Sequence, residues 1–165
     1  MNRVSSPLLF ETSYNRAHCE IGIVHLGFGA FHRAHQALFV DDFMDQSADL
    51  RWGIAAVNLR AAESVAFAGL NAASNGYVVK SMSSGGEVDY RRVRSHVKFA
   101  DWAQESDAAE ALLALPSVHM VTITVTESGY YLDETGALNP ADPVIKDELA
   151  GGKPTSVYGY LTGAL

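Results

Sequence analysis

Cysteine and basic residues are both scarce in this sequence. The single cysteine, Cys19, excludes an internal disulfide and a cysteine metal cluster, and its polar surroundings favour an ordinary free thiol over a catalytic one. Lysine and arginine number 12 against 19 aspartates and glutamates, so the net charge is −7. A nucleic-acid partner needs a basic surface, and none is expected. The one basic run, Arg91–Arg94, alternates with apolar residues and predicts the solvent-facing side of a strand.

Long apolar runs are also missing. No stretch approaches the roughly 20 residues that span a bilayer, and Val4–Phe10 is too short and too interrupted for a secretory core. We therefore expect a cytoplasmic location and no membrane partner. The residues that are present, 48% apolar and 19% charged among 165, are typical of one folded domain with a sizeable core.

The most informative segment is a glycine turn between a strand pattern and a helix pattern. Ile21–Leu26 is an apolar run typical of a buried parallel strand, and Gly27-Phe28-Gly29 follows it directly. Gly27 would allow a tight turn, and Gly29, which has no Cβ, would let a pyrophosphate approach the amides of the following helix. The usual third glycine is replaced by His32, so an ordinary strand-to-helix turn remains the alternative.

Strand and helix patterns alternate along the chain, which predicts a doubly wound, Rossmann-like α/β fold with a parallel sheet. We expect residues 1–20 to form an irregular arm and 21–165 the dinucleotide-binding domain. Two alternating strands around Ser83–Gly86 predict an antiparallel hairpin insertion. The expected strands are Ile21–Leu26, Arg51–Val57, Tyr77–Met82, Val88–Val97 and Val118–Val125, and the expected helices are Phe31–Asp45, Ala61–Leu70, Val144–Ala150 and one from its N-cap Asp101 to Leu115.

Two histidines in the first predicted helix have metal-ligand spacing. His32 and His35 are three residues apart and share a helix face, and Asp41 and Asp42 follow one to two turns later. No third ligand lies at a recognisable distance, so we expect no metal site. We expect His35 and Gln36 to tie this helix to neighbouring backbone.

The residues after the glycine turn, Phe31–Ala37, read Phe-His-Arg-Ala-His-Gln-Ala. They resemble the start of the mannitol dehydrogenase family of polyol and sugar-acid dehydrogenases, which use a nicotinamide cofactor. Further resemblance, in the family's order, lies at Trp52–Ile54, Val57–Arg60, Thr122–Tyr130 and Lys153–Thr155. The resemblance covers nearly the whole chain from Ile21 onward and implies a nucleotide-binding domain.

The resemblance also implies an activity. Family members interconvert a secondary alcohol of a polyol or sugar acid with the ketone by hydride transfer to NAD(P). The glycine-turn string and Asn58–Arg60 look closer to the hexuronate members (fructuronate reductase, which makes mannonate) than to the mannitol enzymes. The family's catalytic lysine region lies beyond the resembling part, and no lysine here matches it. We therefore expect the carboxy-terminal catalytic domain to be absent from this chain, which alone could be inactive.

The end of the second predicted strand should determine the choice of cofactor. Glu63 could accept hydrogen bonds from ribose hydroxyls and favour NAD, whereas Arg60 could pair with the 2′-phosphate of NADP. A first-turn helix role for Glu63 is the alternative, and we favour NAD. His32 and Arg33 are expected near the phosphates. The expected cofactor-binding residues are Gly27, Phe28, Gly29, Ala30, Phe31, His32, Arg33, Asn58, Arg60, Glu63 and Thr126.

Glu127 follows the last predicted strand, and α/β enzymes place ligand-facing groups at such carboxyl ends. The resemblance implies that this glutamate faces the active site and relays protons to solvent. A buried carboxylate there would have a raised pKa. The alternative is a glutamate that caps a loop. Thr122 and Thr126 are expected on the same rim.

Two other functions stay open. The chain could be a nucleotide-binding module without turnover, either a remnant or one half of a split enzyme whose catalytic half is a separate chain. It could also be an α/β domain that binds another anionic ligand through the Gly27–Gly29 turn. Under the main hypothesis its partners are a nicotinamide dinucleotide and a small polyol or sugar acid.

Overall fold

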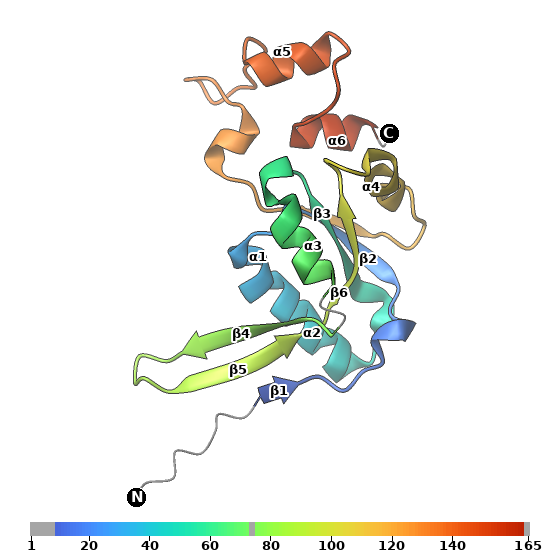
Figure 1. The fold of residues 1–165 in the computed structure, drawn as a ribbon, viewed down its shortest axis with the longest axis vertical. Coiled ribbons are helices and arrows are strands. Elements are labelled where there is room, and N and C mark those ends of the chain that lie inside the picture. Colours follow the sequence, from blue (N-terminus) through green and yellow to red (C-terminus); the bar gives the residue numbers. More distant parts are fainter. Residues whose placement is uncertain (1–8, 73–74, 164–165) are drawn as a thin grey trace, which may run out of the picture.

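A four-stranded parallel sheet forms the centre of the computed structural model, which describes residues 9–72 and 75–163 (Figure 1). The two central strands are almost wholly buried, as a parallel sheet covered on both faces requires. The strands, in the order β6-β3-β2-β7, are β2 (Ile21–Leu26), β3 (Gly53–Asn58), β6 (His96–Asp101) and β7 (Met120–Ile123).

This strand order confirms the predicted Rossmann-like fold. From β2 the chain moves outward to β3 and then β6, and it crosses back over the sheet to place β7 on the other side of β2. At such a reversal the connections leave neighbouring strands on opposite faces of the sheet. A crevice opens at the carboxyl ends of β2 and β7, where α/β proteins bind their ligands.

Helices cover both faces of the sheet. The side chains of β2 and β3 alternate between two apolar clusters, as the two-residue period of a strand dictates. One cluster includes α4 (Ser106–Leu113) and α6 (Val157–Gly163), and the other faces α2 (Gln36–Ser47) and the hairpin. A third cluster packs α3 (Ser64–Ala72) beside Phe28. None of the helices in the described ranges is long and apolar enough to cross a membrane.

A second, three-stranded sheet contains the predicted hairpin. β4 (Tyr77–Met82) and β5 (Val88–Val93) pair antiparallel, and β1 (Leu9–Glu11) adds in parallel to β5. The prediction of an irregular arm is therefore wrong for Leu9–Glu11 and for Arg16–His18, which forms a 3₁₀ turn, and residues 1–8 lie outside the described residues. The hairpin lies at the opposite end of the molecule from α5 (Pro143–Leu149), as Figure 1 shows.

The predicted strand Val88–Val97 is two strands, β5 and β6, in different sheets. The chain turns between them at Arg94 and Ser95. The amide of Arg94 donates to the buried carboxylate of Asp41 at 3.1 Å, and Ser95 Oγ donates to the Ala37 carbonyl at 2.7 Å. Both acceptors belong to α2, so a helix remote in sequence fixes this corner.

The single helix predicted after the glycine turn is also divided. It forms α1 (Ala30–Ala34) and α2, because His35 leaves helical angles with φ −122° and ψ −84°. The prediction of Asp101 as an N-cap is wrong. Asp101 ends β6, and its carboxylate accepts the Ala103 amide at 3.1 Å, which turns the chain before α4 begins.

The basic run does not face solvent as its alternation predicts. The side chains of Arg91, Arg92 and Arg94 are only 14% to 25% exposed. Arg91 pairs with Asp42 of α2, and Arg92 Nε lies 3.0 Å from a Glu11 carboxylate oxygen of β1. The run therefore attaches the hairpin to the amino-terminal segment and to α2.

Candidate functional site

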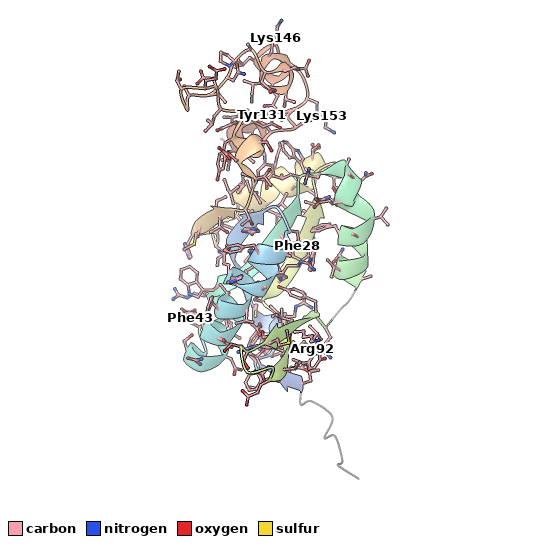
Figure 2. All side chains as sticks on the ribbon, turned by 90° about the vertical axis from the view of Figure 1, so that its left-hand side faces the viewer. Phe28, Phe43, Arg92, Tyr131, Lys146 and Lys153 are labelled. Atoms are coloured by element: carbon pink, nitrogen blue, oxygen red, sulfur yellow. The ribbon has the colours of Figure 1, made fainter. Side chains whose placement is uncertain are left out.

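A cavity of about 480 Å³ lies at the carboxyl ends of β2, β3 and β7, where the strand order reverses. Residues from four segments line it. In Figure 2, the lining residue Phe28 lies near the middle of the molecule, and Tyr131 lies nearer the end that carries α5. The predicted cofactor contacts that line the cavity are Gly27, Phe28, Gly29, Asn58, Arg60, Glu63 and Thr126.

The glycine turn forms the first wall of the cavity, and its two glycines have different structural roles. Gly27 has φ +92°, in the region that side chains disfavour, and a Cβ there would lie 2.8 Å from the Thr124 carbonyl oxygen. Gly29 has φ −69°, and a Cβ there would meet no atom within 4 Å. The turn itself requires Gly27, whereas a glycine at Gly29 leaves open space beside the cavity.

The second wall is the end of β3. The Asn58 side chain is buried and engaged within the protein: its Nδ2 donates to the Arg60 carbonyl at 3.0 Å and to Asp101 at 3.2 Å. Beyond it, Arg60 and Glu63 form an exposed ion pair with an N–O distance of 3.2 Å. The predicted determinants for NAD and for NADP therefore contact each other at the rim.

The third wall follows β7. Thr124, Val125, Thr126 and Ser128 line the cavity, and Thr126 Oγ1 lies 3.0 Å from Ser128 Oγ. Glu127 begins a short 3₁₀ turn, and its side chain is exposed and outside the lining. The expectation of a buried carboxylate is therefore wrong for the structure of this chain. Glu127 lies between two residues that line the cavity, Thr126 and Ser128, without lining it itself.

The fourth wall of the cavity was not among the site residues predicted from the sequence. Thr155, Ser156 and Val157, just before and at the start of α6, also line the cavity. The Glu148 carboxylate holds them, because it accepts the amides of Thr155 at 2.5 Å and Ser156 at 2.6 Å and the Ser156 hydroxyl at 2.6 Å. Burial works to raise the pKa of Glu148, but these hydrogen bonds outweigh it and lower the pKa. The Lys153–Thr155 motif was the available signal.

His32, predicted beside the phosphates, lies in the core instead. Its ring stacks flat on that of His25 of β2, and its Nε2 is 2.9 Å from Nε2 of His96. Its Nδ1 is 3.0 Å from Gln36 Oε1. The side chain is 1% exposed, so the prediction of a phosphate contact is wrong for the imidazole. The partners on β2 and β6 that draw it inward are remote in sequence.

The histidines of this cluster are uncharged. Burial, followed by the neighbouring His32, lowers the pKa of His25 to about 3. Burial also lowers the pKa of His32 to about 4, and it holds the pKa of His96 well below its usual value. The sheet beneath the cavity thus contains neutral imidazoles that act as hydrogen-bonding groups.

The other predicted residues of α1 lie beside the cavity lining. Ala30 and Phe31 are exposed at the start of the helix. The Arg33 guanidinium carbon lies 5.5 Å from the Phe28 ring centre and 5.9 Å from that of Tyr77, a cation–π arrangement. Arg33 is not among the residues that line the cavity and packs on the ring of Phe28, which does line it, so this placement does not favour its predicted role at the phosphates.

His32 and His35, which have metal-ligand spacing, do not belong to a metal-binding group. Across residues 9–72 and 75–163, no set of three or more His, Cys, Asp or Glu side chains could hold an ion. His35 Nδ1 lies 3.1 Å from the Phe31 carbonyl oxygen of its own helix. Gln36 Nε2 donates to the Thr122 hydroxyl at 3.1 Å, so it ties the helix to a side chain of β7. Thr122, expected on the rim, lies in the histidine network beneath it.

Residues 21–165 match the family model described as the mannitol dehydrogenase Rossmann domain. The chain belongs to the mannitol dehydrogenase family. This confirms the resemblance in the motifs. All the walls of the cavity, from the glycine turn to the segment before α6, lie within the family's Rossmann domain.

Several curated proteins are similar to this mannitol dehydrogenase family chain. Mannitol 2-dehydrogenase of Cereibacter sphaeroides is 32% identical over 154 residues, which are 93% of this chain and 32% of the relative. D-mannonate oxidoreductase of Escherichia coli (strain K12) is 37% identical over 159 residues, again 93% of this chain and 32% of the relative. The chain thus spans about a third of the length of the curated relatives it matches.

Solved structures of a mannitol 2-dehydrogenase and a D-sorbitol dehydrogenase share the fold. The ternary complex of Pseudomonas fluorescens mannitol 2-dehydrogenase with NAD and D-mannitol has a TM-score of 0.88 and 29% identity, and the match covers 96% of this chain and 33% of that one. D-sorbitol dehydrogenase in its substrate-free form has a TM-score of 0.85 and 26% identity, with 94% and 33% covered.

Proposed function

We propose that this chain binds NAD in the cavity, as the nucleotide-binding domain of an oxidoreductase. The enzyme would interconvert a secondary alcohol of a polyol or sugar acid with the ketone by hydride transfer. The observation that carries the proposal is the turn after β2, where the backbone requires Gly27 and where Gly29 leaves open space beside the cavity. The Rossmann-domain match and a relative solved with NAD and D-mannitol support this cofactor.

The glycine turn and the start of α1 are proposed to hold the pyrophosphate. The first amides of a helix have no acceptor within the helix, so those of Ala30 and Phe31 can donate to phosphate oxygens. Because Gly29 has no Cβ, the phosphates can approach the backbone. In this proposal, Ala30 and Phe31 bind the phosphates through their backbone amides. Their side chains are not needed for binding and are exposed.

Glu63 is proposed as the ribose partner, with NAD favoured over NADP. Its carboxylate can accept hydrogen bonds from the ribose hydroxyls, and its charge repels a 2′-phosphate. The ion pair with Glu63 also compensates the charge of Arg60, which would otherwise attract that phosphate. Asn58 contributes indirectly, because its side chain holds the backbone of Arg60.

Bound NAD supplies the hydride acceptor for oxidation of the alcohol. We propose that Glu127 exchanges protons with solvent, a role that an exposed carboxylate after β7 can fill. The group that polarises the substrate carbonyl is proposed to lie in the part of the relatives that this chain does not span. These 165 residues alone are therefore expected to bind cofactor without turnover.

The substrate class is proposed from the relatives and the turn. Relatives carry the names mannitol 2-dehydrogenase and D-mannonate oxidoreductase, so mannitol and mannonate are the compounds to test. The glycine-turn string and Asn58–Arg60 lead us to favour the mannonate and fructuronate pair over mannitol and fructose.

Calorimetric titration of the 165-residue chain with NAD and NADP tests the proposal. NAD should bind more tightly than NADP. Binding of phosphate or of a nucleoside diphosphate without any binding of NAD would favour a different anionic ligand. An absorbance assay of NADH with mannonate and mannitol should show no turnover. Turnover by these residues alone would overturn the assignment of the carbonyl-polarising group to the part of the relatives that this chain does not span.

A further inference from the structure

Thr124 connects the cavity to the buried histidine network. It lines the cavity just beyond the end of β7, and its hydroxyl forms a hydrogen bond with Nε2 of His25. His25 is 1% exposed on β2, and its other ring nitrogen, Nδ1, lies 2.7 Å from Thr122 Oγ1. The two contacts arise because His25 and Thr122 are register partners in the parallel pair β2–β7, and Thr124 lies on the same side of the chain.

The positions of the hydrogens in this network can be assigned by starting from Gln36. Gln36 Oε1 can only accept, so the His32 Nδ1 that lies 3.0 Å away carries a hydrogen. A neutral His32 then accepts at Nε2, and His96 must donate from its own Nε2 across 2.9 Å. His96 Nδ1 is left as a bare acceptor, and among the buried side-chain atoms of the described residues it is the histidine nitrogen without a hydrogen-bond partner.

This orientation of Gln36 sets the direction of the remaining bonds. Its Nε2 donates to Thr122 Oγ1 at 3.1 Å. The Thr122 hydroxyl lies nearer to His25 Nδ1, at 2.7 Å, than to Gln36 Oε1, at 3.2 Å, which favours donation of its single hydrogen to the imidazole. With that assignment, a neutral His25 would carry its hydrogen on Nε2 and donate it to Thr124 Oγ1. The hydrogen of Thr124 remains available to the cavity.

We propose that Thr124 is a hydrogen-bond donor to an oxygen acceptor of the bound nucleotide, and that His25 is the positioning residue that orients it. The inference rests on the proposed function, and it adds a ligand contact and a buried residue that acts through that contact. The flat stack with His32, at a centroid separation of 3.4 Å, holds the His25 ring in the plane that reaches both threonines.

Affinities of four variants for NAD, measured by calorimetry, test the proposal. Thr124→Val should weaken binding about fivefold to tenfold, the usual effect of one neutral hydrogen bond, and Thr124→Ser should bind like the wild type. His25→Phe keeps a stacked ring but removes both nitrogens, and it should weaken binding by a similar factor. The double variant should bind no more weakly than Thr124→Val, because His25 acts only through Thr124.

The outcomes separate the two hypotheses. A wild-type chain that does not bind NAD overturns the proposed function together with this inference. NAD binding that is equal in the wild type and Thr124→Val overturns the inference alone, as do effects of the two substitutions that multiply. Long-range ¹H–¹⁵N correlation spectra of the ligand-free chain give a second test. His25 should be the Nε2–H tautomer, and the Nδ1–H tautomer would overturn the proposed bond direction even if His25→Phe lowered stability.

Discussion

The imidazole of His32 lies parallel to that of His25, with ring centroids 3.4 Å apart and planes 7° apart. His32 occupies the position at which a dinucleotide turn usually has its third glycine, the residue that allows close packing of helix and strand. A flat ring needs little more room than the thickness of its π-system. The stack therefore lets α1 stay close to β2 without a glycine, and it adds hydrogen bonds to Gln36 and His96 that a glycine could not make.

The two glycines of the turn should respond differently to alanine. Gly27→Ala should lower the free energy of unfolding by about 2 kcal/mol, since it combines a left-handed φ with a close contact to the Thr124 carbonyl. Gly29→Ala should leave unfolding within about 0.5 kcal/mol of the wild type and weaken NAD binding by about tenfold or more, because its methyl group enters the cavity side of the turn. Urea unfolding and calorimetry measure both effects. A Gly29→Ala chain that binds NAD normally would argue against the pyrophosphate placement.

Stability should fall on the acid side of neutrality. The pKa values of His25 and His32, about 3 and about 4, lie below the 6.5 of the unfolded chain. Between those values the unfolded state binds more protons, so the free energy of unfolding decreases as the pH drops from 6.5 toward 4. Each histidine contributes up to about 1.4 kcal/mol per pH unit in this window. Urea titrations from neutral to mildly acidic pH measure the slope.

Two variants test the origin of this pH dependence. His25→Phe removes one titrating group from the buried cluster, so its stability should depend less steeply on pH. His119→Ala changes an exposed histidine and should keep the wild-type slope. Burial raises the pKa of Asp41, an effect of opposite sign that all three chains share. Equal slopes for His25→Phe and the wild type would contradict the assignment of neutral, buried imidazoles.

The rim pair should determine the ratio of NAD to NADP affinity. Glu63→Gln removes the charge that repels a 2′-phosphate and releases Arg60 from its ion pair. We expect the affinity ratio to shift toward NADP by about tenfold, equivalent to about 1.4 kcal/mol. Adding Arg60→Gln to this variant should reverse most of the shift. An unchanged ratio in Glu63→Gln would show that the ribose lies elsewhere.

Glu148 should affect binding from outside the cavity. Glu148→Gln keeps the size of the side chain but weakens three hydrogen bonds to Thr155 and Ser156. Charge-assisted bonds of this kind contribute about 1.5 to 3 kcal/mol, so both the unfolding midpoint and the NAD affinity should decrease. Glu134→Gln, at an exposed site in the preceding loop, is the matched control and should change neither.

Elements with local signals could be predicted from the sequence, and those held by remote contacts could not. β2 has the same bounds in the prediction and in the structure, because its apolar run and the Gly27–Gly29 turn are consecutive. The split between β5 and β6 depends on α2, whose Asp41 and Ala37 hold the corner at Arg94 and Ser95. Nothing near that corner in the sequence indicates a change of sheet.

The same distinction applies to the cavity. The first two walls follow strand ends that the sequence predicts, so Gly27, Gly29 and Glu63 were found. Thr124 was missed because β7 was expected to extend to Val125, whereas it ends at Ile123. His32 was placed wrongly because a helical position next to a phosphate loop favours a charged donor, and only the fold reveals two other histidines beside it.

The cavity is assembled from segments that begin at Gly27 and end at Val157, almost the full described length of the chain. A ligand that contacts all four walls binds with full affinity only when the whole sheet and its connections have folded. Occupancy and global folding are then linked, and saturating ligand adds to stability in proportion to the logarithm of its concentration. Retention on immobilised nucleotide would accordingly select, from a library of variants, the chains that have completed the whole fold.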